Sequence, residues 1–334
     1  MKNHRVSASI LAFFCALTVL VITPQSASAW WACGHHVVAN LAYDQLAPKE
    51  QKALIDLLKH HPRFALDFNP PETVKNDPEA VDRWRIGAAA YWPDVARKFP
   101  TWSRSKWHYQ LGAAQTIGDP AKLNVPKSPG PLPPGASLAT QDLHIEQAIL
   151  LCRQVALDVK RPKPERAVAL CWLLHLYGDG HQPCHAGSLY TVDAFPDGDL
   201  GGNRIKVKDR MSIHAIWDSQ LGSQTTPEEI AKRTKEIQAD TKLAEFARSK
   251  ANDSHPSAWL HEDRKLAQRY VYTVELFAAL SSAPKDKRGN VELPKLSTTY
   301  FDDAARIARQ QAAVAGARLS PLLQRIAWAN STSR

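Results

Sequence analysis

The amino-acid sequence predicts a mainly α protein built as a single helical domain. Apolar residues recur at helical spacing in several long blocks, whereas the alternation typical of a strand is confined to one short stretch. No internal repeat and no long linker divides the chain. With 334 residues and an apolar fraction of 44%, the chain is long enough to bury a large core, and general disorder is not expected.

Residues 1–29 have the pattern of a cleavable secretory signal. Two basic residues precede an apolar stretch over residues 10–22, and the small residues 27–29 follow it. A membrane anchor is the alternative, but the apolar stretch falls short of the ~20 residues that a bilayer requires. We therefore expect a mature domain of residues 30–334 that is secreted or periplasmic and has no stable membrane insertion.

The mature chain is basic. The signal contains Lys2 and Arg5 and no acidic residue, so its removal lowers the formal net charge from +9 to +7. This net positive charge favours an anionic partner such as nucleic acid or phospholipid headgroups. Many exported proteins are basic without binding either, and no dense run of lysine and arginine concentrates the charge. The charge supports an anionic substrate without identifying it.

Helices are predicted in order along the mature chain. Pro48 marks a helix start ahead of apolar residues within 54–58, and apolar residues from Ile145 to Ala156 recur on one face. Residues 167–176 are almost wholly apolar, which indicates a buried helix. Two further long helices are expected, over residues 266–280 and 304–317.

Strand and loop signals are few. Alternating side chains over residues 203–208 predict one short strand. Residues 125–135 are rich in proline and residues 195–202 are rich in glycine, so both are expected to be loops between helical blocks.

The most informative stretch runs from His175 to His185. His175 and Asp179 are four residues apart, so a helix projects them from one face, where they can hold one metal ion together. Pro183 disfavours helix at the residue before it, which should bend the chain and direct His185 toward a second ion. His181 is interpreted as structural.

A second pair, His214 and Asp218, repeats the four-residue spacing. Imidazole combined with carboxylate is a ligand set that suits Zn²⁺. Either pair alone is more often a hydrogen-bonded histidine with a neighbouring acid. Two such pairs together with His185 in one exported chain favour metal binding.

Trp30 and His35 lie close to the N-terminus that signal cleavage would create. A free amine at Trp30 can chelate a metal ion together with its own carbonyl, provided that the amine is unprotonated, and its ordinary pKa of ~8 makes that accessible near neutrality. The alternative is an ordinary frayed terminus with no role.

Two further motifs supply groups suited to a phosphodiester. Asp94 and Arg97 offer a carboxylate and a guanidinium, and His108 and Tyr109 offer an imidazole and an aromatic face. Arginine can hold phosphate oxygens through its fork of donors, and a nucleobase can stack on tyrosine. Each residue alone would more often be structural.

Four cysteines remain in the mature chain: Cys33, Cys152, Cys171 and Cys184. In an oxidising compartment they can form one or two disulfide bonds or remain buried thiols, and the sequence does not specify a pairing. Thiolate ligation of a metal is less favoured, because no C-x-x-C spacing is present.

Taken in order, nine residues resemble the metal ligands of the zinc-dependent, single-strand-preferring nucleases of fungi, plants and bacteria. The matching motifs are Trp-Pro-Asp-x-x-Arg, Trp-His-Tyr, His-x-x-x-Asp followed by Gln-Pro-x-His, Gly-Gly-Asn, His-x-x-Trp-Asp and a C-terminal Ala-Gly-Ala-Arg-Leu. The match extends over nearly the whole mature chain. The nine residues are Trp30, His35, Asp94, His108, His175, Asp179, His185, His214 and Asp218.

The resemblance implies a helical fold of the zinc phospholipase C and single-strand nuclease type that holds three zinc ions. In that family, one ion is bound by the equivalents of Asp94, His108, His175 and Asp179. A second is bound by the amine and carbonyl of Trp30, with His35 and a bridging Asp179, and a third by His185, His214 and Asp218.

The same resemblance implies substrate roles. Arg97 is expected to hold the scissile phosphate, Asp94 to orient the attacking water, and Tyr109 and Asn203 to engage a base. The expected activity is hydrolysis of single-stranded DNA or RNA to 5′-phosphate products. Leu111, Ser212 and Cys184 depart from the residues usual in the family, and the departures bear on base preference more than on metal binding.

Two alternative functions remain. A bacterial zinc phospholipase C also uses an N-terminal tryptophan, but its first histidine lies much farther along, and its last ligand is usually glutamate where this chain has Asp218. A non-enzymatic zinc-storage protein could use the same ligands. It would need neither Arg97 nor Tyr109, so an enzyme that hydrolyses phosphodiester bonds is favoured.

Overall fold

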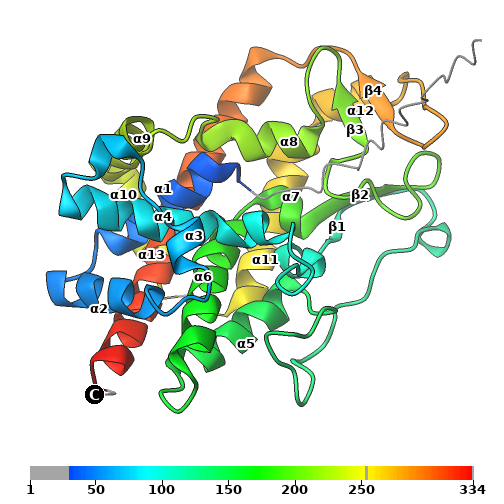
Figure 1. The fold of residues 1–334 in the computed structure, drawn as a ribbon. Coiled ribbons are helices and arrows are strands. Elements are labelled where there is room, and N and C mark those ends of the chain that lie inside the picture. The colour runs from blue at the N-terminus through cyan, green and yellow to red at the C-terminus, as the bar shows by residue number, and fades with distance from the viewer. Residues whose placement is uncertain (1–29, 253–254, 333–334) are drawn as a thin grey trace, which may run out of the picture.

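The computed structural model describes residues 30–252 and 255–332, and the expected signal peptide, residues 1–29, lies outside them. Helices make up most of the described chain, which confirms the mainly α prediction, and two short parallel strand pairs accompany them. In Figure 1 the helices α1, α4 and α6 cross the middle of the molecule, and the strands lie together at one side.

The core is built around α6 (Lys163–Asp179), which is buried on all sides over most of its length. It packs against α1 (Ala32–Tyr43), α4 (Pro78–Ala96) and α5 (Ile145–Leu157). A helix that is apolar on every face is stable only when neighbouring helices cover it. The buried helix predicted over residues 167–176 is therefore confirmed, and so is the amphipathic helix that begins at Ile145.

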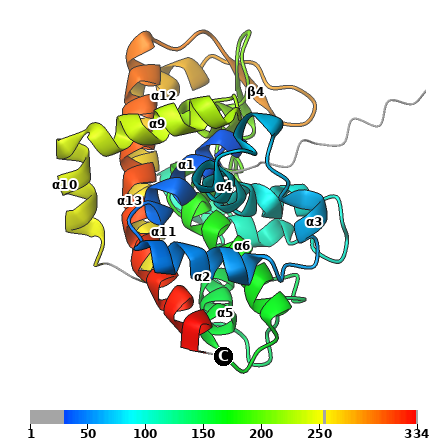
Figure 2. The same ribbon diagram turned by 60° about the vertical axis from the view of Figure 1, so that its left-hand side comes forward.

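The longest helix, α13 (Thr298–Thr332), runs along one side of the molecule (Figure 2) and includes the predicted segment 304–317. It packs against α1, against α2 (Pro48–Leu58) and against α10 (Thr241–Lys250). The α2 helix begins at Pro48 as predicted, since proline at the first helical position lacks only an N–H that would have no intrahelical partner there.

Shorter elements surround this core. The other α-helices are α3 (Phe64–Asp67), α7 (Pro183–Ala186), α8 (Ile213–Asp218), α9 (Pro227–Ala239), α11 (Pro256–Leu266) and α12 (Val274–Leu280). Single 3₁₀ turns are η1 (Glu72–Val74), η2 (Ser105–His108), η3 (Pro120–Lys122) and η4 (Ser219–Leu221), and η5 (Ala267–Val271) is a π turn. Strand β1 (Gly112–Ile117) pairs with β2 (Gly187–Thr191), and β3 (Ile205–Val207) pairs with β4 (Val291–Leu293).

The prediction of one continuous helix over residues 266–280 is wrong. The chain leaves the π turn at Tyr272, whose φ of −96° and ψ of 64° are not helical, and α12 starts afresh with Thr273 capping the N–H of Leu276. Tyr272 is buried, and its hydroxyl donates to the carboxylate of Asp199. This tertiary hydrogen bond, together with the threonine cap, outweighs the helical periodicity of the segment.

The predicted strand over residues 203–208 is shorter than expected, because only Ile205–Val207 pairs with another strand. The preceding turn contains Leu200, Gly201 and Gly202 at positive φ, so the chain is still turning when it reaches Asn203. The loops expected over residues 125–135 and 195–202 contain no helix and no named strand.

The four cysteines of the mature chain are buried free thiols, so the expectation of a disulfide bond is not met within the described residues. Burial raises the pKa of each thiol above its usual value. Cys152 and Cys171 belong to the main hydrophobic core, where a thiol packs as a small apolar side chain.

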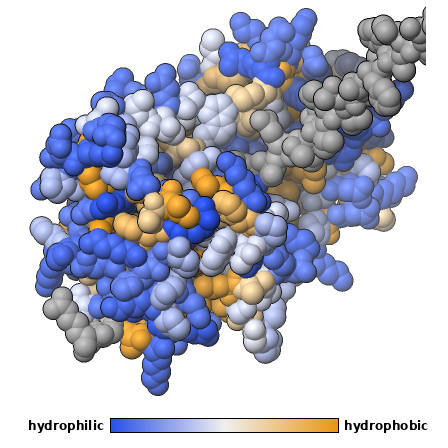
Figure 3. Space-filling view, viewed as in Figure 1, coloured by the Kyte–Doolittle hydropathy of each residue, from blue (hydrophilic) through white to orange (hydrophobic). Residues whose placement is uncertain are grey.

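The outer part of the face drawn in Figure 3 is mostly hydrophilic, and hydrophobic side chains gather near its middle. Among the described residues, no helix combines the length and the apolar character needed to span a bilayer.

Candidate metal centre

Histidine and aspartate side chains from six elements meet at the ends of the central helices. His35 comes from α1, Asp94 from α4, His108 from η2, and His175 and Asp179 from the end of α6. His185 lies on α7, and His214 and Asp218 lie on α8. All are buried except Asp94, which is half-buried, and they form three groups that could each hold a metal ion.

The first group surrounds the carboxylate of Asp179. Its Oδ2 lies 3.0 Å from His108 Nδ1 and 3.1 Å from His175 Nε2, and these two nitrogens lie 2.8 Å apart. Asp94 Oδ1 is 3.9 Å from the His108 nitrogen and 4.0 Å from the His175 nitrogen. A tetrahedral zinc ion with bonds of about 2.0–2.1 Å separates its ligand atoms by roughly 3.3 Å. Asp94, His108 and His175 form a group that could hold one such ion, and Asp179 Oδ2 lies beside the two imidazole nitrogens.

The second group uses the other oxygen of Asp179. His35 Nε2 lies 3.5 Å from Asp179 Oδ1 and 4.0 Å from Asp94 Oδ2. The rings of His35 and His175 stack with their centroids 4.0 Å apart, which brings the two groups side by side. One carboxylate therefore faces two neighbouring groups, each with a different oxygen.

Trp30 is held beside Asp179, and the residue after it is bonded to Asp218. Its side chain is fully buried, and its indole Nε1 donates to the carbonyl of Gly178, the residue before Asp179. The next backbone N–H, that of Trp31, donates to the carbonyl of Asp218 at 3.0 Å. Because Gly34 has no side chain, the first turn of α1 approaches closely: a Cβ there would meet Trp30 Cβ at 2.6 Å.

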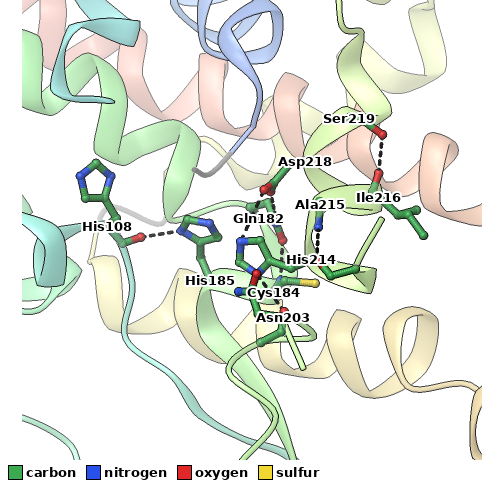
Figure 4. Close-up of polar contacts among 12 residues, drawn as sticks. His108, Gln182, Cys184, His185, Asn203, His214, Ala215, Ile216, Asp218 and Ser219 are labelled. Carbon is green, nitrogen blue, oxygen red and sulfur yellow. Dashed lines mark hydrogen bonds and ion pairs between the residues drawn. The ribbon is translucent and has the colours of Figure 1, made fainter. Parts of the chain in front are cut away.

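The third group consists of His185, His214 and Asp218 (Figure 4). The two imidazole rings lie 4.9 Å apart between centroids, and His214 Nε2 is 3.5 Å from Asp218 Oδ2. The turn after α6 separates His185 from His175 and Asp179, because Gln182 is extended ahead of Pro183 and α7 starts in a new direction. The predicted bend is confirmed, and His185 belongs to a different group from His175.

Backbone carbonyls orient three of the imidazoles. Nδ1 of His175 contacts the carbonyl of Ala90 at 2.7 Å, that of His185 contacts His108 O at 2.6 Å, and that of His214 contacts Gly201 O at 2.8 Å. A carbonyl oxygen only accepts, so each Nδ1 carries the proton and each Nε2 presents its lone pair to the site. This is the usual orientation of metal-ligating histidines.

The electrostatics of these groups suit a bound cation. Burial lowers the pKa values of His35, His108 and His185 well below the usual value for histidine, and it lowers the pKa of His214 to about 4. These imidazoles are therefore neutral, the form that binds metal. The Nε2 atoms of His35, His185 and His214 make no hydrogen bond within the described residues. Buried neutral imidazoles with unused lone pairs beside carboxylates fit a metal ion.

The acids of the site respond to the same burial. Burial raises the pKa of Asp179 to about 6 and raises the pKa of Asp218 well above its usual value. Burial alone would lower the pKa of His175, but Asp179 and Asp94 outweigh it and raise that pKa. A bound cation would favour the ionised carboxylates and offset the cost of burying them.

Three further predicted residues lie around the groups. Arg97 Nε forms an ion pair with Asp94 Oδ1 at 2.9 Å, and its Nη2 has no hydrogen-bond partner within the described residues. Tyr109 directly follows His108 in an extended conformation and is half-buried. Asn203 is half-buried in the turn whose Gly201 carbonyl orients His214, and its side chain donates to the carbonyl of Leu200.

His181 has the structural role expected for it. Its Nδ1 donates to the carbonyl of Tyr177, and its Nε2 faces Arg318 Nη1 at 2.9 Å. Sequence reasoning noted Gln182 only as part of the Gln-Pro-x-His motif and predicted no role for it. Its side chain is fully buried and contacts Asp218 at 2.5 Å. Its place in that motif, between Asp179 and His185, is a signal that could have singled it out.

Comparison with known proteins finds similarity to nucleases over most of the chain. A family model described as S1/P1 Nuclease matches residues 30–328. Endonuclease 3 of Arabidopsis thaliana is 22% identical over 331 residues, covering 93% of this chain and 94% of that protein. Endonuclease 2 of the same plant is 24% identical over 305 residues, covering 89% and 90%. The similarity therefore includes every element that carries a group of the candidate centre.

Proposed function

The chain belongs to the S1/P1 nuclease family and hydrolyses phosphodiester bonds, and from that premise we propose a secreted, three-zinc enzyme that acts on single strands. Its substrate is single-stranded DNA or RNA, and its products carry 5′-phosphates. Membership of a family of endonucleases favours this function over the phospholipase and zinc-storage alternatives.

The proposed ligands follow the three groups. Asp94, His108 and His175 hold one ion together with Asp179, whose Oδ2 lies within 3.1 Å of both imidazole nitrogens, and His185, His214 and Asp218 hold another. His35 and the second oxygen of Asp179 hold the remaining ion, together with the amine and carbonyl of Trp30 once the signal is removed. The buried indole of Trp30, fixed to Gly178, supports this assignment because it keeps the residue beside Asp179.

The observation that carries the proposal is the two-sided contact of Asp179. Oδ2 lies within 3.1 Å of two imidazole nitrogens, while Oδ1 lies 3.5 Å from a third. A carboxylate shared in this way suits two ions held close together. Imidazole and carboxylate without thiolate suit zinc, since all four cysteines lie outside the groups.

Bound zinc would polarise the phosphate and make water a better nucleophile at neutral pH. The chain's own residues position the reactants. Asp94 accepts a hydrogen bond from the attacking water, while its ion pair with Arg97 fixes the guanidinium beside it. The unpartnered Nη2 of Arg97 donates to a phosphate oxygen. Tyr109 and Asn203 contact the base next to the scissile bond.

The experiment combines metal content with hydrolysis by the mature protein. Elemental analysis should find about three zinc ions per chain, and chelation should abolish the release of acid-soluble nucleotides from denatured DNA or RNA. Phosphatidylcholine serves as the control substrate. Turnover of that lipid without nucleotide release, or one zinc ion or none with no cleavage, would refute the proposal.

A further inference from the structure

Gln182 stands between two ligand-bearing segments and touches both. Its backbone N–H donates to the carbonyl of Asp179 at 3.1 Å, and its own carbonyl accepts from the N–H of His185 at 2.8 Å. The side chain is fully buried. Neither the ligand assignment nor the mechanism above gives this side chain a role.

The side-chain amide joins two partners of opposite kind. Its Nε2 donates to Asp218 Oδ1 at 2.5 Å, and its Oε1 accepts from the backbone N–H of Cys184, which caps the start of α7 (Figure 4). A carboxylate only accepts and an N–H only donates, so the two partners fix the orientation of the amide. An ionised carboxylate or a hydrocarbon side chain of this length could not serve both.

The contact also determines which oxygen of Asp218 faces the metal group. With Oδ1 taken up by Gln182, Oδ2 is the atom that lies 3.5 Å from His214 Nε2. Among the described residues, Gln182 is the side chain that donates a hydrogen bond to this buried carboxylate. Asp218 and His185 lie on different helices, and the amide ties one to the start of the other.

We propose that Gln182 is a positioning residue that sets the affinity of the His185, His214 and Asp218 group for its metal ion. This inference rests on the proposed zinc centre. Gln182 aligns Asp218 for single-oxygen ligation and holds α7 at a fixed distance from α8. Partners that orient a metal ligand in this way typically change metal affinity by about 10- to 100-fold when removed.

The test compares wild type with Gln182→Met, which keeps the length of the side chain and removes both hydrogen bonds. Zinc retained per chain is measured by elemental analysis after equilibration with graded concentrations of a chelator. The expected result is that one ion is held about 10- to 100-fold more weakly while the other two are held as in wild type.

Gln311→Met is the matched control. Gln311 is also buried, and its Nε2 donates to Asp263 Oδ1 at 2.6 Å, so the control breaks the same kind of hydrogen bond outside the metal groups. It should lower thermal stability and leave the affinity for all three ions unchanged. A general loss of folding stability is thereby separated from a specific loss of one ion.

His214→Ala identifies the weakened ion, because it removes a ligand of that group outright. Adding Gln182→Met to His214→Ala should leave the affinity for the two remaining ions unchanged. Gln182→Asn provides a second variant if the methionine variant does not fold. Asparagine can still cap α7, but it withdraws the donor from Asp218 by one methylene, so the same ion should be weakened.

Three results would overturn the inference. One is unchanged affinity for every ion in both Gln182 variants. Another is an equal weakening of all three ions, which would make Gln182 a general structural residue. The third is a wild-type protein that holds no zinc, in which case the proposed centre fails first and the role of Gln182 fails with it.

Discussion

Asp199→Asn should make the metal-free protein more stable at neutral pH. Asp199 is fully buried, and its carboxylate accepts from the N–H of Leu189 at 3.0 Å and from the hydroxyl of Tyr272 at 3.0 and 2.9 Å. Burial nevertheless dominates and raises the pKa of the carboxyl from 3.8 to about 6. The folded protein therefore disfavours the ionised form that is present at pH 7.

The magnitude follows from linkage. Each tenfold change in proton affinity corresponds to about 1.4 kcal/mol, so ionising Asp199 in the folded state costs about 3 kcal/mol. Between pH 4 and pH 6 the folded chain keeps a proton that the unfolded chain has lost, so the free energy of unfolding falls as pH rises through this window. The amide oxygen of an asparagine can still accept from the N–H of Leu189 and the hydroxyl of Tyr272, both of which reach Oδ1, and because it carries no charge it escapes this loss.

The assay is urea unfolding of wild type and Asp199→Asn from pH 3.5 to 7.5, with chelator present so that metal binding does not contribute. The two free energies of unfolding should be similar below pH 4. By pH 7 the variant should be more stable by up to about 3 kcal/mol. The reasoning would be refuted if the difference in free energy of unfolding between the two proteins did not change with pH. It would also be refuted if wild type became more stable relative to the variant between pH 4 and 6.

Three further outcomes are expected. Arg97→Ala should lower kcat/KM on denatured DNA by about 10²–10³-fold, because it removes a preorganised donor to the phosphate. Its zinc content should stay at the wild-type value, and loss of zinc would contradict this role. A precursor that retains the residues before Trp30 should hold one zinc ion fewer than the mature protein and be nearly inactive, whereas equal zinc content in the two forms would exclude the amine ligand. Burial lowers the pKa of His61 to about 4, so wild type should lose stability as pH falls from about 6.5 to 4. Measured by urea unfolding, the free energy of unfolding of His61→Leu should fall less steeply with decreasing pH than that of wild type. Parallel pH dependences in the two proteins would argue against this role of His61.

The mainly α fold and the positions of most long helices could be predicted because they depend on local patterns. Proline at Pro48 and the apolar residues after Ile145 act within a few turns, and α2 and α5 begin where these signals lie. The pairing of His175 with Asp179 is local in the same way, since a helix always brings residues four apart onto one face.

Interactions between distant segments explain the errors. The predicted helix over residues 266–280 breaks because Tyr272 bonds to Asp199, which is 73 positions away in the chain. The four cysteines are buried free thiols in three hydrophobic clusters, and spacing along the sequence could not decide between this outcome and a disulfide bond. The contact of Gln182 with Asp218 was not predicted, because the two residues lie 36 positions apart in the chain.

The sequence by itself therefore determined which residues could act and which helices carry them. Residue type fixes the available donors, and a helical period of 3.6 fixes which of them share a face. Only the tertiary structure decided that Asp179 turns one oxygen toward His108 and His175 and the other toward His35. The physical reason is that a side chain's rotamer and the direction of its lone pairs are set by the atoms packed around it, and in this chain those atoms come from six separate elements.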